Sequence, residues 1–268
     1  MSEGGRDVSV TLTPKIRVES LSYSYRRRGS EDVQALDELN LTVGKGEFVS
    51  VVGPSGCGKS TLLRVLAGLQ RPTGGSAGVL REDGARPLMA PVFQEYSIFP
   101  WRTVEDNVRL GLDAAKVPRA ESNARVREWI SRVGLTGFEK AYPSHLSGGM
   151  KQRVALARAF VLEPEVLLMD EPFAALDAQL RKVLQEELLG ICQERDYTVF
   201  FVTHNLDEAI LLSDRIALMT ARPGRVEEVY DVPFGHPRTP DLRKSPEFVA
   251  LEEQIWDRLR GEVQGGRK

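Results

Sequence analysis

The chain has 268 residues, with 36 Lys and Arg against 38 Asp and Glu, so its formal net charge is −2. This length allows one large α/β domain or two smaller ones, and 41% hydrophobic with 28% charged residues is typical of a globular protein with a buried core. The near-neutral charge gives no electrostatic reason to expect a nucleic-acid partner, and two cysteines are too few for a disulfide scaffold, which fits a reducing cytoplasm.

The first half of the chain begins with a polar stretch, residues 1–14, that is predicted to be flexible. Alternating apolar residues predict strands over 16–25 and 39–43, with a basic hairpin turn at 26–30 between them. The apolar, β-branched run at 48–52 predicts a buried strand, and a glycine loop then leads into a helix over 60–69. Residues 70–87 are rich in glycine and are predicted to form loops and short hairpins.

Strands and helices alternate through the second half of the chain. Strands are predicted over 88–93, 166–170 and 198–203, and helices over 103–135, with breaks near Gly111 and Pro118, and over 148–162 and 177–194. This alternation predicts an α/β fold with a largely parallel sheet covered by helices. Residues 215–219 and 225–230 are predicted to add antiparallel strands, and Ser245-Pro246 opens a last helix.

The sequence predicts neither a membrane-spanning helix nor a signal peptide. The longest apolar stretches, such as 210–219, are shorter than the roughly 18 residues that a spanning helix needs, and charges interrupt them. The first ten residues are polar and lack a basic segment followed by an apolar one. If this protein works at a membrane, another component must anchor it there.

Residues 53–60 fit the phosphate-loop pattern G-x-x-x-x-G-K-[ST], directly after a predicted strand and at the start of a predicted helix. Glycines let backbone N–H groups turn toward phosphate oxygens, and the helix N-terminus adds a favourable dipole. Lys59 is expected to reach the β- and γ-phosphates, and the Ser60 hydroxyl to coordinate Mg²⁺. This pattern predicts nucleotide binding and leaves kinases, GTPases and motor ATPases open. The predicted contacts are Gly53, Pro54, Ser55, Gly56, Cys57, Gly58, Lys59, Ser60 and Thr61.

A second glycine turn, Leu146-Ser147-Gly148-Gly149, precedes a predicted helix. Ser147 can cap that helix, while Gly148 and Gly149 expose backbone N–H groups at its start, which makes a second anion site. One nucleotide does not need two such sites, whereas two copies of the chain facing head to tail would use both. An ordinary capped helix is the alternative interpretation of these residues taken alone.

Residues 146–153 resemble the signature sequence of ATP-binding-cassette (ABC) ATPases, and the other motifs of that family follow in order. Residues 166–171 resemble the Walker B strand, residues 175–177 the D-loop, Gln94 the Q-loop glutamine and His204 the switch histidine. The resemblance covers roughly residues 15–230. It implies a P-loop ATPase cassette with a mixed, mainly parallel sheet, an antiparallel β part and a helical subdomain at about 95–160.

The resemblance also implies a role for each carboxylate and its neighbours. Asp170 would hold Mg²⁺, and Glu171 would polarise the attacking water as general base. His204 would contact the γ-phosphate, and Gln94 would sense both Mg²⁺ and the attacking water. Asp177 would bind nucleotide as part of the D-loop.

Adenine is expected to bind by stacking on an aromatic ring rather than through a specific set of polar contacts. Tyr25 matches the position of the family's adenine-stacking aromatic residue, and such stacking is worth about 1–3 kcal/mol. Tyr23, two residues away on the same predicted strand face, is the competing candidate, and motif spacing favours Tyr25.

The segment from Phe99 to Val108 resembles the region after the Q-loop in importer ATPases for nitrate, sulfonates and taurine. The stretches Arg222-Pro223-Gly224-Arg225 and 245–248 also resemble that subfamily. The resemblance implies ATP and Mg²⁺ as cofactors. It implies as partners a second copy of the chain, integral membrane permease subunits and, indirectly, a substrate-binding protein, with no nucleic acid. The expected location is the cytoplasmic face of the inner membrane, as a peripheral subunit, with a cassette over 15–232 and a C-terminal extension over 233–268.

Other functions in this family remain open at this point. The chain could serve another importer class, or it could be an ABC ATPase that acts on DNA or ribosomes. The long coiled-coil insertion or second cassette typical of those last proteins is absent from this sequence. A subunit that binds ATP without hydrolysing it is disfavoured because Glu171 and His204 are both present. An exporter is a weaker alternative, and a kinase or GTPase lacks the glycine signature.

Overall fold

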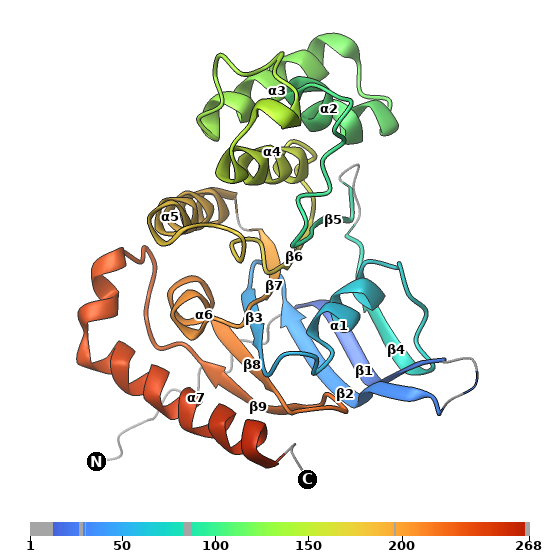
Figure 1. Ribbon diagram of the computed structural model, residues 1–268, viewed down its shortest axis with the longest axis vertical. Coiled ribbons are helices and arrows are strands. Elements are labelled where there is room, and N and C mark those ends of the chain that lie inside the picture. Colours follow the sequence, from blue (N-terminus) through green and yellow to red (C-terminus); the bar gives the residue numbers. More distant parts are fainter. Residues whose placement is uncertain (1–12, 27–28, 30, 83–86, 196, 266–268) are drawn as a thin grey trace, which may run out of the picture.

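The computed structural model describes residues 13–26, 29, 31–82, 87–195 and 197–265. Two sheets form its centre (Figure 1). A six-stranded sheet has the order β5-β6-β7-β3-β8-β9, parallel throughout except for β9, and a three-stranded antiparallel sheet has the order β2-β1-β4. The strands are β1 (Pro14–Tyr25), β2 (Val33–Gly44), β3 (Phe48–Val52), β4 (Gly74–Val79), β5 (Met89–Val92), β6 (Val166–Asp170), β7 (Thr198–Val202), β8 (Arg215–Met219) and β9 (Val226–Asp231).

The central strands β3, β6 and β7 are buried along their full length, as their continuous apolar sequences predict for parallel strands covered on both faces. The helices are α1 (Lys59–Leu66), α2 (Val104–Ala114), α3 (Arg119–Arg132), α4 (Gly148–Phe160), α5 (Ala178–Arg195), α6 (Leu206–Leu212) and α7 (Pro246–Gly265). Short 3-10 helices span Pro143–His145 and Pro240–Lys244. This arrangement confirms the predicted α/β fold with a mixed sheet.

Helices α2, α3 and α4 gather at one end of the molecule, beyond the edge of the main sheet (Figure 1). The rings of Trp129 on α3 and Phe160 on α4 stack with centroids 5.1 Å apart. The predicted break at Gly111 is wrong, because α2 runs through it. A Cβ atom there would lie 2.7 Å from Leu162, so the glycine permits close packing inside the helix rather than ending it.

Two further predictions are corrected by the structure, and one element was missed. The glycine-rich stretch 70–87 contains β4, which pairs with β1 and completes the antiparallel sheet. The first helix after the phosphate loop ends at Leu66 rather than at residue 69. Helix α6 was not predicted, and it begins where the Asn205 side chain accepts a hydrogen bond from the Glu208 N–H.

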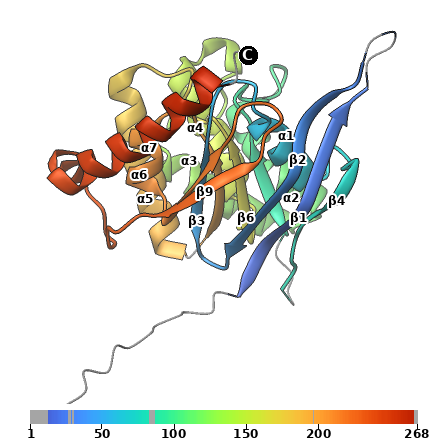
Figure 2. The ribbon, with the colours of Figure 1, turned by 90° about the horizontal axis from the view of Figure 1, so that it is seen from below.

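The C-terminal helix α7 lies across α6 and the edge of the main sheet (Figure 2). Its buried residues Phe248, Ile255 and Leu259 pack with α6 and β8 in one apolar cluster. Most of the predicted hairpin turn at 26–30 and of the predicted flexible start lies outside the described residues, although β1 and β2 do pair antiparallel on either side of that turn. Within the described part of the chain, no helix has both the length and the apolar character to cross a membrane.

Candidate functional site

A cavity of about 390 Å³ lies around the N-terminus of α1, where the turn that follows β3 leads into the helix. The residues around it come from six separate parts of the sequence. They are Tyr25, Ala35, Ser55, Gly56, Gly58, Lys59, Ser60, Thr61, Gln94, Glu171 and Arg222. The fold therefore brings the predicted phosphate loop together with the predicted Q-loop glutamine, the predicted general base and the predicted aromatic residue.

The glycines of this loop are needed for its conformation. Gly56 and Gly58 have φ of 76° and 108°, in the left-handed region that favours glycine. A Cβ atom on Gly58 would lie 2.6 Å from the Leu36 side chain and 2.8 Å from the Ala35 carbonyl oxygen. Because α1 begins at Lys59, the first N–H groups of the helix lie at the edge of the cavity and favour an anion there.

The Lys59 side chain is buried and is held by the loop itself. Its ammonium donates hydrogen bonds to the carbonyl oxygens of Gly53 (2.7 Å) and Pro54 (3.1 Å). Cys57 is buried beside it, and burial raises the pKa of the Cys57 thiol. The Lys59 side chain thus lies next to the cavity, where it can bind phosphate oxygens.

Ser60 and Asp170 form a second polar pair at the same place. The Ser60 hydroxyl donates to a carboxylate oxygen of Asp170 over 2.9 Å, and Asp170 is the last residue of β6. Burial raises the pKa of Asp170; the Glu171 charge adds to this, and the Ser60 hydrogen bond opposes it. A hydroxyl and a carboxylate placed side by side are oxygen ligands of the kind that Mg²⁺ prefers.

Glu171 and His204 contact each other at the ends of two neighbouring strands. The His204 Nδ1 lies 3.0 Å from a carboxylate oxygen of Glu171. Glu171 has φ of 45°, a left-handed conformation that a non-glycine residue seldom adopts, and its N–H donates to the Val202 carbonyl. This strained turn directly follows β6, and Glu171 lines the cavity there.

Of the two candidate aromatic residues, the structure places Tyr25 on the cavity and Tyr23 against an apolar cluster of the core. Their rings contact each other edge to face, with centroids 4.9 Å apart. The Tyr25 hydroxyl forms a hydrogen bond of 2.9 Å with the Thr61 hydroxyl on α1, which fixes the ring beside the phosphate loop.

The second glycine turn lies away from the cavity within this single chain. Ser147 caps α4 by accepting a hydrogen bond from the Met150 N–H, as predicted. A Cβ atom on Gly149 would lie 2.0 Å from Leu180, so this turn packs closely on the start of α5. Asp177 accepts hydrogen bonds from the first N–H groups of that helix, and it too lies outside the cavity.

Arg222 lines the cavity although no role at the site was predicted for it. It lies in the loop between β8 and β9, and both Nε and Nη2 donate to the Gly56 carbonyl oxygen, over 3.3 and 3.2 Å. The residues lie 166 positions apart, so no local spacing could have indicated the contact.

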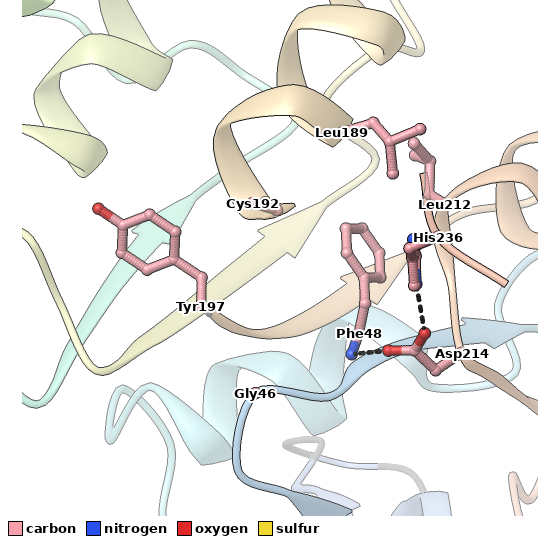
Figure 3. Close-up of a pocket in the computed structure, with 8 residues that line it drawn as sticks. All are labelled: Gly46, Phe48, Leu189, Cys192, Tyr197, Leu212, Asp214 and His236. Carbon is pink, nitrogen blue, oxygen red and sulfur yellow. Dashed lines mark hydrogen bonds and ion pairs between the residues drawn. The ribbon is translucent and has the colours of Figure 1, made fainter. Parts of the chain in front are cut away.

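A second cavity, of about 330 Å³, lies beside the end of α5 (Figure 3). It is lined mainly by apolar residues, among them Phe48 and Leu189, and none of the predicted site residues lines it. Asp214 accepts a hydrogen bond from the Phe48 N–H over 2.8 Å and lies 2.8 Å from the His236 Nε2 (Figure 3). These contacts hold the start of β3 to the segment after β9.

Comparisons with known proteins agree with the geometry. Residues 36–174 match the sequence profile of the family described as ABC transporter. An uncharacterized ABC transporter ATP-binding protein of Methanocaldococcus jannaschii is 49% identical over 251 residues, which cover 93% of this chain and 92% of that protein. The aliphatic sulfonates import ATP-binding protein SsuB of Bacillus anthracis is 46% identical over 239 residues, 88% of this chain and 92% of that protein.

A solved structure has the same fold. The ATP-binding cassette MJ0796, in a dimeric post-hydrolysis state bound to ADP and Pi, superposes with a TM-score of 0.72 at 31% sequence identity. The superposition covers 82% of this chain and all of that one.

Proposed function

We propose a cellular task for this chain, which belongs to the ABC transporter family of ATP-binding proteins and is an ATPase. Its proposed task is to power the import of a small organic or inorganic anion of the sulfonate class through a membrane permease. The observation that carries this proposal is the 46% identity to a sulfonate import ATP-binding protein over 88% of the chain. We further propose that the cassette spans residues 15–232, with a helical subdomain at about 95–160, and that residues 233–268 are an extension.

The experiment that tests this function is growth of the source cell after loss of the gene. We expect slower growth on an aliphatic sulfonate as the sole sulfur source, restored by the parent chain but not by a chain carrying Glu171→Gln. Normal growth on sulfonates with a defect on nitrate or another anion would assign the chain to a different importer class. Normal growth on all such solutes would contradict the importer function.

The positions of Ser147, Gly148 and Gly149 support a head-to-tail dimer. They lie outside the cavity of their own chain, where the phosphate loop already provides an anion site. In the proposed dimer, each nucleotide contacts the phosphate loop of one copy and this glycine turn of the other. The dimeric state of MJ0796 supports this arrangement.

Mg²⁺ is proposed to bind with the nucleotide. The Ser60 hydroxyl and the Asp170 carboxylate, 2.9 Å apart, are the residues of this chain that fit the ion as ligands. Bound there, Mg²⁺ would neutralise charge on the phosphates. We propose that Glu171 orients the attacking water as general base and that His204 contacts the γ-phosphate. We also propose that Gln94 senses Mg²⁺ and the attacking water, and that Tyr25 stacks on adenine.

The first prediction concerns Asp170. Because its pKa is raised in the folded state, the folded protein disfavours the ionised form, and stability is lost as pH rises from the ordinary carboxyl pKa through the raised one. Asp170→Asn is therefore expected to raise the free energy of unfolding of the nucleotide-free chain by about 1 kcal/mol at pH 7, and to remove ATPase activity. Denaturant unfolding at pH 7 and at pH 4 measures the effect. A stability gain that is as large at pH 4 as at pH 7 would contradict the ionisation argument.

The second prediction concerns coupling to the permease. The Trp101 side chain is exposed over 70% of its surface, and its ring centroid lies 5.2 Å from that of Phe99. We propose that Trp101 contacts the permease, because aromatic residues are enriched at protein interfaces. Trp101→Ala is expected to keep basal ATPase activity within about twofold and to lower permease-stimulated activity about tenfold. The control is Leu69→Ala, which removes another exposed apolar side chain, located just beyond the end of α1. Equal stimulation by the permease of the parent chain, Trp101→Ala and the control variant would exclude Trp101 from the interface.

A further inference from the structure

The loop between β8 and β9, residues 220–225, is folded tightly against the phosphate loop. Gly224 donates to the Ala35 carbonyl over 2.9 Å and accepts from the Asp37 N–H over 3.1 Å. A Cβ atom on Gly224 would lie 2.0 Å from the Cys57 carbonyl oxygen, so the backbones of the two loops are in direct contact. Arg225 forms an ion pair with Asp37, which holds the other end of the loop.

Arg222 extends from this loop over Gly56. Its two N–H donors converge on the Gly56 carbonyl oxygen, and a Cβ atom on Gly56 would lie 3.5 Å from Arg222 Nη2. Because a trans peptide is planar, fixing the Gly56 carbonyl also fixes the opposite direction of the Cys57 N–H. The Cys57 N–H also donates to the Pro54 carbonyl within the loop, over 3.3 Å. The guanidinium therefore holds the carbonyl side of a peptide whose N–H side is held by the loop itself.

The C-terminal helix reaches the same loop from the other side. The Glu262 carboxylate accepts a hydrogen bond of 3.0 Å from the Ala221 N–H, one residue before Arg222. Figure 2 shows this end of α7 beside the tip of the β8–β9 hairpin. Helix α7 is itself anchored through Ile255 and Leu259 to the cluster that contains α6. A continuous line of contacts therefore runs from α7 through Glu262, Ala221 and Arg222 to Gly56.

We infer that Arg222 is a positioning residue for the phosphate loop, and that α7 sets the nucleotide affinity of the loop through the β8–β9 loop. The inference rests on the proposed function, since it requires that ATP binds at the phosphate loop. A loop whose peptides are already oriented loses less conformational freedom when it binds phosphate, so loss of the contact weakens binding. Chemistry at the γ-phosphate, which Glu171 and His204 face, is left intact.

The test measures the KM and kcat of ATP hydrolysis and the Kd for Mg-ATP and ADP. Arg222→Gln is expected to raise KM and both Kd values about five- to tenfold, with kcat within about twofold. Arg222→Lys restores part of the affinity, because an ammonium can still donate to the Gly56 carbonyl. Glu262→Ala, which removes the acceptor for the Ala221 N–H, is expected to raise KM about two- to threefold. The double variant is expected to match Arg222→Gln alone, because both changes act through one contact.

The control for charge is Arg17→Gln, which removes an exposed arginine on β1 that lies 3.8 Å from Glu19. Unchanged affinity in Arg222→Gln would overturn the inference, and so would a loss of kcat and of nucleotide-free thermal stability at unchanged KM. Effects of Arg222→Gln and Glu262→Ala on KM that add would overturn the part assigned to α7. Lys59→Ala separates failure of the proposed nucleotide site from failure of the inference about Arg222. If Lys59→Ala still binds ATP, the proposed nucleotide site is wrong. If Lys59→Ala does not bind ATP while Arg222→Gln binds it normally, only the inference about Arg222 is wrong.

Discussion

Glu171→Gln is expected to abolish ATP hydrolysis and to make the chain dimeric in ATP. The amide cannot accept a proton from water, and loss of a positioned general base lowers turnover by about 10²–10⁴-fold. Glutamine has nearly the same shape and can keep the contact with His204, which lies 3.0 Å from the carboxylate. The substitution also removes a negative charge beside the γ-phosphate, which favours the closed dimer.

Size-exclusion chromatography with light scattering, at high protein concentration, measures the dimer. The variant is expected to be a monomer without nucleotide and in ADP, and a dimer in ATP, because in the proposed dimer the second copy's glycine turn binds the γ-phosphate. Glu19→Gln removes one exposed negative charge on β1 and should hydrolyse ATP like the parent. Equal dimer in all three conditions would contradict a nucleotide-bridged interface, and normal turnover of Glu171→Gln would exclude Glu171 as the base.

The sequence predicted those parts of the site whose chemistry depends on local spacing. The phosphate loop is recognisable because its glycines, Lys59 and Ser60 must follow a strand and open a helix within eight residues. The strand that ends at Asp170 is likewise predictable, since a buried parallel strand is continuously apolar until it reaches the carboxyl edge of the sheet. In each case one segment of chain carries the full signal.

Contacts between distant segments were not predictable. Nothing in the local sequence of Arg222 shows that it lies over Gly56, because tertiary folding alone brings the two together. Strand alternation puts Tyr23 and Tyr25 on one face, yet β1 is irregular at Tyr23 and only Tyr25 of the pair lines the cavity. Helix α6 was missed because its seven residues are too few to show a helical period clearly.

Lys59→Ala is expected to remove both ATP binding and turnover. The Lys59 ammonium is the cation that the phosphate loop itself places at the cavity, and its donors are already oriented by the carbonyl oxygens of Gly53 and Pro54. Loss of one preorganised donor to a charged group costs about 10²-fold or more in turnover. The two carbonyl oxygens also lose their donor, so we expect the nucleotide-free variant to unfold at a lower temperature than the parent.

Two further variants separate binding from stability. Lys59→Met keeps much of the buried aliphatic volume and loses only the ammonium, so it should be more stable than Lys59→Ala while binding ATP equally poorly. Lys45→Ala removes an exposed lysine that pairs with Glu82 over 2.8 Å, and it should bind ATP like the parent. Titration with Mg-ATP and thermal unfolding without nucleotide measure the two effects independently. Near-normal ATP binding by Lys59→Met would show that the cavity beside α1 is not the nucleotide site, because no phosphate can be held there without its buried cation.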